Sequence, residues 1–157
     1  MLSHRRGWGV QPESGLDPEP PIAPTSWTGH MPQLIVVADD DPFSREGLRL
    51  LLANWGYEVE TASDGRVALQ KIWADQPVAV ITDVVMPVMN GLELLGTLRS
   101  EKPGMPVIVL TGQGSLETLL RARREGAHAF LRKPVDVRQL KSVLASALAK
   151  GNEERTP

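Results

Sequence analysis

The sequence predicts an α/β fold in which a five-stranded parallel sheet is covered by helices on both faces. Short apolar runs, mostly of β-branched residues, alternate five times with longer stretches in which apolar residues recur every three to four positions. Most of these runs carry no polar alternation, as expected for strands buried on both faces of a parallel sheet. With 157 residues, the chain is long enough to bury such a core.

The composition excludes several other classes of protein. The chain contains no cysteine, which rules out a disulfide scaffold, cysteine-based zinc sites and thiol catalysis. The formal net charge of -2 gives no reason to expect a direct nucleic-acid partner or a membrane surface. No apolar run approaches the roughly 18 residues that a membrane span needs. We therefore expect a soluble protein with a cytoplasmic location.

The chain divides into three segments by composition. Residues 1–32 are crowded with Pro, Gly, Ser and Thr and show neither helix nor strand periodicity, so we predict a disordered extension. Residues 33–150 carry the alternating pattern and form the predicted folded domain. Residues 151–157 are predicted to be a polar tail.

The first strand–helix unit begins with an apolar strand over residues 34–38. Asp41 and Pro42 are a typical N-cap and first helical residue, and Gly56 ends the helix that follows. The predicted apolar face of this helix consists of Phe43, Leu48, Leu51, Leu52 and Trp55.

The second unit opens with residues 57–61, whose polar and apolar side chains alternate as in an edge strand with one solvated face. Asp64 and Gly65 then turn the chain into a helix that closes before Pro77. Val67, Ala68, Ile72 and Trp73 are its predicted apolar residues.

The remaining three units follow the same plan. Strands are predicted over residues 78–82, 107–110 and 129–132, each followed by a helix, over residues 91–100, about 115–125, and from Asp136 to Lys150. The five repeats imply a parallel sheet with right-handed crossovers. We expect the doubly wound, flavodoxin-like (βα)5 arrangement with strand order 2-1-3-4-5, an order that the repeats alone do not fix.

Polar side chains stand where four of these strands end. They are Asp39 and Asp40 after the first strand, Asp83 after the third, Thr111 after the fourth and Lys133 after the fifth. Because the carboxyl ends of parallel strands share one edge, these groups should converge on one crevice. Carboxylates alone would repel one another, so the cluster predicts a cation, and oxygen ligands suit Mg²⁺. We interpret Asp83 as a nucleophile for a phosphoryl group.

The sequence resembles the response-regulator receiver domain of two-component signalling. The matching stretches are LIVVADDDP, ITDVVMPVMNG, VIVLTG and AHAFLRKP, in the order and at about the separations of the family. The resemblance covers residues 33 to about 150. One such motif would be weak, but four in register on a predicted (βα)5 sheet are specific.

The resemblance implies a role for each matching position. Asp83 would accept phosphate from a sensor histidine kinase or a histidine phosphotransfer protein, with Lys133 and Thr111 assisting. Asp83, Asp40 and the backbone carbonyl of Val85 would ligate Mg²⁺ directly, and Asp39 mostly through water. Thr111 and Phe130 would form a switch pair, and the bond between Lys133 and Pro134 would be cis.

Two positions depart from the commonest family pattern. Phe130 stands where Tyr is frequent, which removes a hydroxyl contact but leaves ring rotation available. Val85 lies two residues after Asp83, where a polar side chain often orients the attacking water. We therefore hypothesise slow autodephosphorylation, with Gln113 as a further influence.

The family uses the face formed by the fourth helix, the fifth strand and the fifth helix for output, and here that face is basic. Since nothing after residue 150 reads as an output domain, we expect the signal to leave by protein–protein contact. That contact could be docking to a downstream effector protein, onward transfer of the phosphate in a relay, or service as a phosphate sink. Three alternatives are weaker. A turnover aspartyl-phosphate phosphatase of the dehalogenase type needs a second Asp where Val85 stands, and a flavin-binding protein needs a phosphate loop where this chain has three aspartates. A receiver used only as a scaffold would not need a full set of site residues.

Overall fold

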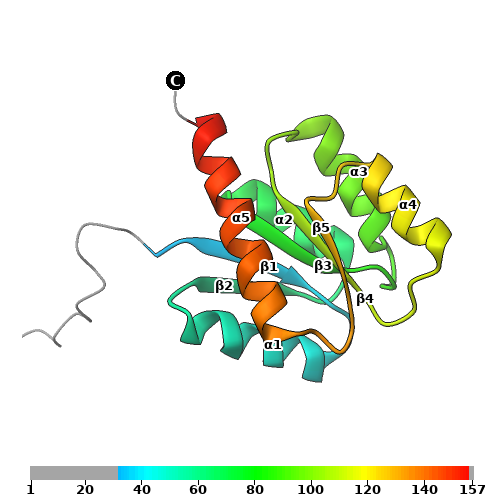
Figure 1. Cartoon of the computed structure of the whole chain (residues 1–157), viewed down its shortest axis with the longest axis horizontal. Helices are drawn as coiled ribbons and strands as arrows, with labels where there is room; N and C mark the ends of the chain where they lie inside the picture. Colours follow the sequence, from blue (N-terminus) through cyan, green and yellow to red (C-terminus); the bar gives the residue numbers. More distant parts are fainter. Residues whose placement is uncertain (1–31, 156–157) are drawn as a thin grey trace, which may run out of the picture. The chain divides into compact units, whose positions relative to one another are not determined.

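The computed structural model describes residues 32–155, and for residues 151–155 it describes the backbone alone. Five strands and five helices alternate along this part of the chain (Figure 1). They are β1 (Leu34–Ala38), α1 (Pro42–Asn54), β2 (Glu58–Ala62), α2 (Gly65–Asp75), β3 (Ala79–Asp83), α3 (Gly91–Glu101), β4 (Val107–Thr111), α4 (Leu116–Arg124), β5 (Ala129–Arg132) and α5 (Val137–Arg155).

The strands form one parallel sheet in the order β2-β1-β3-β4-β5, which confirms the predicted fold class and strand order. The first strand lies in the interior and the chain winds outward from it in both directions. β2, predicted to be an edge strand, is at one edge. The strand bounds differ from the predicted ones by one residue at most, as at β2 and β3.

The core consists of two apolar layers separated by the sheet. Neighbouring side chains of one strand belong to different layers, because successive residues of a strand point to opposite faces. Ile35 and Val37 face α1 and α5, where they meet Leu52 and Leu144. The other layer lies against α2, α3 and α4 and receives Val36, Val80 and Val109 from the sheet, with Ile72, Leu95 and Ala122 from the helices. Figure 1 shows α1 and α5 together on the near side of the sheet.

Local capping explains where the helices begin and end. Each N-cap side chain accepts a hydrogen bond from a backbone amide of the first turn, as the sequence predicted for Asp41 and Asp136. The N-caps are Asp41, Asp64, Asn90, Ser115 and Asp136. Helices α1 and α4 end in a Schellman motif, with Gly56 and Gly126 at positive φ.

Two predicted apolar contacts are wrong. Phe43 was placed on the buried face of α1, yet its side chain is 87% exposed. Phe43 and Leu52 are nine positions apart, and at about 100° per residue they point in opposite directions. Trp73 of α2 is 47% exposed, and the Nζ atom of Lys102 lies 4.6 Å from its ring centroid. Trp73 therefore makes a surface cation–π contact instead of a core contact.

Helix α5 continues to Arg155, whereas the sequence predicted its end at Lys150 and a polar tail over residues 151–157. The residues after Gly151 include Glu153, Glu154 and Arg155, which are good helix formers. A single glycine costs roughly 1 kcal/mol in a helix and does not have to end it. The predicted disordered extension lies, except for Pro32, outside the described residues.

Within residues 32–155, no helix combines the length and the apolar character that a membrane span requires.

The loop between β3 and α3 contains a strained residue. Val88 has a φ of 66°, in the left-handed region that β-branched side chains avoid, and it is 72% exposed. A residue held there costs about 1–3 kcal/mol. Because the side chain is exposed, little burial offsets this cost.

We therefore expect Val88→Asn to raise the free energy of unfolding by about 1 kcal/mol, since asparagine tolerates the left-handed region. Urea titration of both proteins measures the difference. Val85→Asn is the matched control, because Val85 lies in the same loop, is 65% exposed and has no positive φ. Equal effects of the two substitutions would show that polarity, and not backbone strain, is responsible.

Candidate functional site

Three aspartates meet at the carboxyl edge of the sheet. The register pairs Ala38 of β1 with Thr82 of β3, so the next residues, Asp39 and Asp83, stand at the same level. Asp40 joins them, and one carboxylate oxygen from each of the three lies within 4.8 Å of the others. The predicted convergence of the three aspartates is confirmed as geometry.

Lys133 lies between two of these carboxylates. Its Nζ atom donates hydrogen bonds to Oδ2 of Asp39 at 2.7 Å and to Oδ2 of Asp83 at 3.0 Å. The lysine follows β5, and β4 separates that strand from β3 in the sheet. The bond between Lys133 and Pro134 is cis, as the resemblance implied. One ammonium group therefore connects carboxylates from two other strand ends.

The second oxygen of Asp83 is held by the backbone. Oδ1 accepts a hydrogen bond from the amide of Val84 at 2.7 Å. The loop then folds back, and the amide of Gly91 donates to the carbonyl of Val84 at 2.9 Å. A Cβ on Gly91 would stand only 2.0 Å from the carbonyl oxygen of Asp83, so no other residue fits this close approach. The Asn-Gly pair at this helix start therefore also shapes the site, which the sequence analysis did not predict.

The environment shifts the pKa values of the three linked groups. Burial raises the pKa of the Asp83 carboxyl, and the hydrogen bond and charge of Lys133 only partly oppose this. Burial acts the same way on Asp39, but its hydrogen bonds, the strongest from Lys133, outweigh burial and hold the pKa below its usual value. Burial would lower the pKa of Lys133, yet both carboxylates together raise it. The ammonium is therefore fixed in its charged form.

Asp39 has a further partner that the sequence analysis missed. The Nη1 atom of Arg45 donates to the backbone carbonyl of Asp39 at 2.7 Å, and the amide of Asp41 donates to the Asp39 side chain at 2.9 Å. The Asp39 side chain itself is fully buried. A basic residue in the first turn after an acidic strand end can reach back to that strand, and this spacing is the signal for Arg45. Together these bonds fix Asp39 and its carbonyl in place.

The donor set fits a small divalent cation. Asp40 is exposed, Asp83 is half-buried and Asp39 is buried, so one side of the cluster opens to solvent. All three offer oxygen atoms, and Mg²⁺ prefers a few carboxylates supplemented by water. A single ammonium leaves the three carboxylates with a net negative charge, which favours a cation electrostatically. Asp39, Asp40 and Asp83 are thus the residues able to hold one.

The proposed switch residues lie beside this cluster. Thr111, at the end of β4, is 1% exposed, and its hydroxyl oxygen accepts a hydrogen bond from the Gln113 amide at 3.2 Å. Within the described residues, no hydrogen bond joins Thr111 to Asp83. Phe130 packs against the layer that contains α3 and α4. A Cβ on Gly114 would stand 3.0 Å from Cγ2 of Thr111 and 3.2 Å from Cζ of Phe130, so both side chains already press against Gly114.

The face formed by α4, β5 and α5 carries exposed apolar and basic side chains, together with the acidic Glu117 and Asp136. Leu116, Leu120 and Val137 are apolar and 69%, 46% and 49% exposed. The exposed basic residues are Arg121, Arg123, Arg124, Arg132, Arg138 and Lys141.

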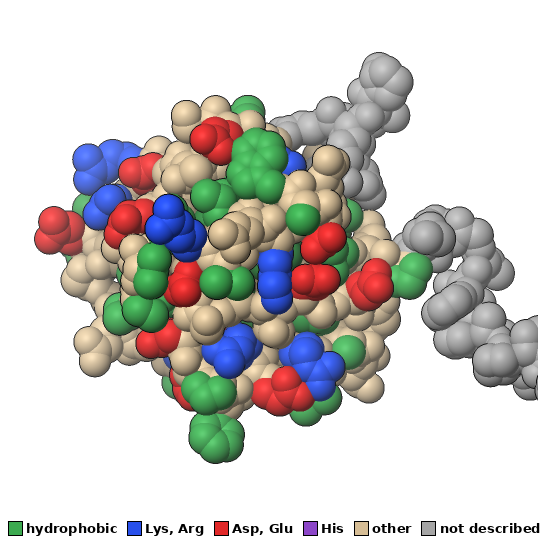
Figure 2. All heavy atoms as spheres, turned by 180° about the vertical axis from the view of Figure 1, so that it is seen from behind, with side chains coloured by type: hydrophobic (Ala, Val, Ile, Leu, Met, Phe, Trp, Pro, Cys, Tyr) green, Lys and Arg blue, Asp and Glu red, His purple; other side chains and the backbone are tan. Residues whose placement is uncertain are grey.

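Figure 2, a view from the opposite side to Figure 1, shows acidic and basic side chains interspersed over the face in view.

Comparison with known proteins identifies close relatives. A family model for the response regulator receiver domain matches residues 35–145. The response regulator MprA of Mycolicibacterium vanbaalenii is 44% identical over 110 residues, which cover 70% of this chain and 48% of MprA. The DNA-binding transcriptional regulator NtrC of Azospirillum brasilense is 39% identical over 114 residues, or 73% of this chain and 24% of NtrC. The chain thus spans about half of MprA and about a quarter of NtrC.

Solved structures agree with these relatives. A CheY-like response regulator receiver domain protein from Methanospirillum hungatei superposes with a TM-score of 0.75 at 32% identity, covering 79% of this chain and 99% of the other. The chemotaxis protein CheY4 of Vibrio cholerae superposes with a TM-score of 0.70 at 34% identity, covering 75% of this chain and all of CheY4.

The position of Lys133 predicts a large stability loss when its charge is removed. In Lys133→Met, the buried Asp39 and the half-buried Asp83 face each other without a cation. Breaking a buried ion pair typically costs about 3–5 kcal/mol, and the 21% exposure of the lysine side chain reduces this, so we expect a loss of about 2–3 kcal/mol at pH 7 in EDTA. Urea unfolding measures it.

Two further variants test the cause. Adding Asp39→Asn to Lys133→Met removes the unpaired charge and should recover part of the loss. Lys71→Met is the surface control, because Lys71 and Glu60 lie 3.8 Å apart with side chains 36% and 39% exposed, and its cost should stay below about 1 kcal/mol. Similar losses in both lysine variants would contradict the assignment of a special role to Lys133.

Proposed function

Because the chain belongs to the response regulator receiver domains of two-component signalling, we propose that it is a switch controlled by phosphorylation of Asp83. The observation that carries this proposal is the shared ammonium of Lys133, which bonds Asp39 and Asp83 at the carboxyl edge of the sheet. A purely structural aspartate at a strand end would need no such arrangement of charges from three strands.

In the proposed reaction, an oxygen of the Asp83 carboxylate attacks the phosphorus of a phosphohistidine. The bond from phosphorus to the histidine nitrogen breaks, the imidazole leaves with the electron pair, and an aspartyl phosphate forms. Lys133 changes partners in this step, from the Asp83 carboxylate to an oxygen of the new phosphoryl group. The Val84 amide, which bonds Oδ1 of Asp83 at 2.7 Å, orients the carboxylate. Positioning and charge stabilisation supply most of the catalysis in such transfers.

We further propose that this reaction depends on Mg²⁺ held by Asp40 and Asp83 directly, by the backbone carbonyl of Val85, and by Asp39 mostly through water. The cluster geometry supports this, with ligand oxygens of the three aspartates within 4.8 Å of one another. Bound Mg²⁺ would neutralise the charge of Asp83 and of the incoming phosphoryl oxygens. The carboxylate of Asp39, fixed by Lys133 and the Asp41 amide, would orient water beside it.

The proposed output pairs Thr111 with Phe130. A phosphoryl group on Asp83 would draw the Thr111 hydroxyl away from the Gln113 amide, and the space that Thr111 leaves beside Gly114 would admit further inward rotation of the Phe130 ring. Movement of that ring would change the α4–β5–α5 face, where an effector protein would bind. The exposed Leu116 and Leu120 of α4 supply an apolar contact area on this face.

The phosphate source would be a sensor histidine kinase or a histidine phosphotransfer protein. We propose that the domain assists its own phosphorylation and dephosphorylation and is not a turnover enzyme. It would bind neither nucleic acid nor membrane directly. NtrC, the relative named above as a DNA-binding transcriptional regulator, is matched over only 24% of its length, so its name does not assign DNA binding to this domain.

The phosphoacceptor assignment predicts one phosphoryl adduct. Incubation of the protein with Mg²⁺ and acetyl phosphate should add the mass of a single phosphoryl group, stable in acid and labile in base. The adduct should be lost in Asp83→Asn and retained in Asp41→Asn, because Asn also caps a helix and Asp41 bonds the amide of Phe43 at the start of α1. Intact mass spectrometry distinguishes these proteins.

Absence of the adduct with acetyl phosphate and with phosphoramidate, or its persistence in Asp83→Asn, would refute the assignment. An adduct that forms equally well in EDTA would refute the magnesium role alone.

The identity of Val85 predicts a long-lived adduct. Val85→Asn should shorten the phosphoryl lifetime about two- to tenfold, the effect of one hydrogen bond to the attacking water. Val88→Asn is the control, since this residue is also exposed in the same loop. The decay of the adduct after removal of the donor gives both rates. An unchanged lifetime in Val85→Asn would remove the basis for slow autodephosphorylation.

A further inference from the structure

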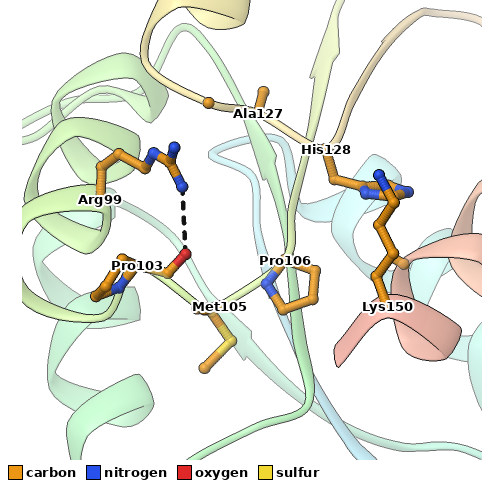
Figure 3. A pocket seen from close by; sticks show the side chains of 10 residues that line it. Arg99, Pro103, Met105, Pro106, Ala127, His128 and Lys150 are labelled. Atoms are coloured by element: carbon orange, nitrogen blue, oxygen red, sulfur yellow. Dashed lines mark hydrogen bonds between the residues drawn. The ribbon is translucent and has the colours of Figure 1, made fainter. Parts of the chain in front are cut away.

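A second polar cavity lies at the other edge of the sheet. Pro106 and His128 line it, directly before the first residues of β4 and β5, so it opens at the amino edge (Figure 3). Strands of four and five residues separate it from the phosphoacceptor edge, which at about 3.3 Å per residue is a distance of roughly 15 Å. The end of α3, the turn after α4, and α5 supply the other walls.

The charged side chains that line this cavity are all basic or potentially so. Arg99 comes from α3, His128 directly precedes β5 and Lys150 comes from α5, and among residues 32–150, whose side chains are described, no Asp or Glu lines the cavity. Figure 3 shows Arg99 on one side of the cavity and His128 with Lys150 on the other. Within the part of the chain whose side chains are described, neither Arg99 nor Lys150 forms a salt bridge.

The simplest structural explanation for these cations is that they neutralise the carbonyl ends of helices. For α4 this need is already met, because the amides of Gly126 and Ala127 bond the carbonyls of Arg123 and Ala122 at 3.0 Å each. Arg99 does have a structural contact, a hydrogen bond from Nη1 to the carbonyl of Pro103 at 3.2 Å. Helix capping therefore accounts for Arg99 in part, and a hydrogen bond with the backbone of Val143 accounts for one nitrogen of His128. Neither explains Lys150.

The donors that face the cavity are complementary to an anion. Lys150 offers an ammonium group, and Arg99 offers the guanidinium nitrogens that Pro103 does not use. Burial, and secondarily the charge of Lys150, lower the pKa of His128, and a hydrogen bond with the backbone of Val143 partly opposes this. The imidazole nitrogen that Val143 does not use donates to an anion in the cationic form of the ring. A bound anion would offset the repulsion between Lys150 and the cationic form of His128.

The remaining lining residues limit the kind of anion. Met105, Pro106, Ala127 and Ala147 form an apolar wall. The cavity volume is about 240 Å³, below the roughly 300–1,000 Å³ of pockets for drug-sized ligands. From this combination we propose that the cavity binds a small phosphorylated organic molecule, with the phosphate between Arg99, His128 and Lys150 and the organic part against the apolar wall.

The proposal can be tested by nuclear magnetic resonance titration of the ¹⁵N-labelled full chain. Inorganic phosphate and phenyl phosphate are the probes, at constant ionic strength and with EDTA present, so that no metal attracts phosphate to Asp83. We expect saturable shifts of the amides of Gly126, Ala127 and His128, with phenyl phosphate binding more tightly. Shifts that rise linearly without saturation, or that occur mainly beside Asp83, would overturn the proposal.

Substitution of one lysine of α5 by glutamine provides the matched comparison. Lys150→Gln removes a proposed ligand, whereas Lys141→Gln removes a lysine whose Nζ lies 5.6 Å from the Trp55 ring centroid, outside the cavity. We expect roughly fivefold weaker binding in Lys150→Gln and unchanged binding in Lys141→Gln. Equal affinities of the two variants would overturn the assigned anion site, and equal affinities of the two probes would overturn the assigned apolar contact. Both replaced lysines are exposed, so neither substitution should unfold the domain.

Discussion

The contact of one ammonium with two carboxylates is the constraint on which the carboxyl edge of this fold depends. Asp39 is fully buried and Asp83 is half-buried, so each would be costly to ionise without a partner. Lys133 is the partner of both carboxylates. Its two hydrogen bonds can form together only because β1, β3 and β5 end at nearly the same level. The parallel register of the sheet provides that level, and the loop after β3 folds tightly over Asp83 because Gly91 has no side chain.

The pattern of apolar and polar residues along the chain was enough to predict the sheet and the acidic cluster. Apolar runs specify buried strands, and parallel topology then brings the strand ends together wherever the polar residues stand. Contacts that depend on the direction in which a side chain leaves a helix were harder to predict from the sequence. Phe43 is close to the apolar residues of α1 in sequence but points away from them, and Arg45 reaches back to Asp39 from a helix that the sequence marked only by its apolar face. The left-handed backbone conformation of Val88 could not be predicted, because valine rarely adopts it.

The two polar regions of this domain lie at opposite edges of the same sheet. At the carboxyl edge, three acids share one lysine and leave an excess of negative charge. At the amino edge, Arg99, His128 and Lys150 face a cavity that no acidic side chain of residues 32–150 lines. The strands β4 and β5 contribute to both regions, since Thr111 and Lys133 stand at or after their ends while Pro106 and His128 precede their starts. A ligand bound at either edge would therefore lie beside an end of the same two strands.

The separation of the core into two layers has a consequence for how a change at Phe130 spreads. Neighbouring residues of β5 point to opposite faces, so Phe130 packs with α3 and α4 while Leu131 packs with α1 and α5. Rotation of the Phe130 ring would therefore disturb the layer of α3 and α4 directly, whereas the layer of α1 and α5 would be affected only through the backbone of β5. The proposed change would thus reach α4 first and α5 second, while β1 and β3 keep the acidic cluster in register.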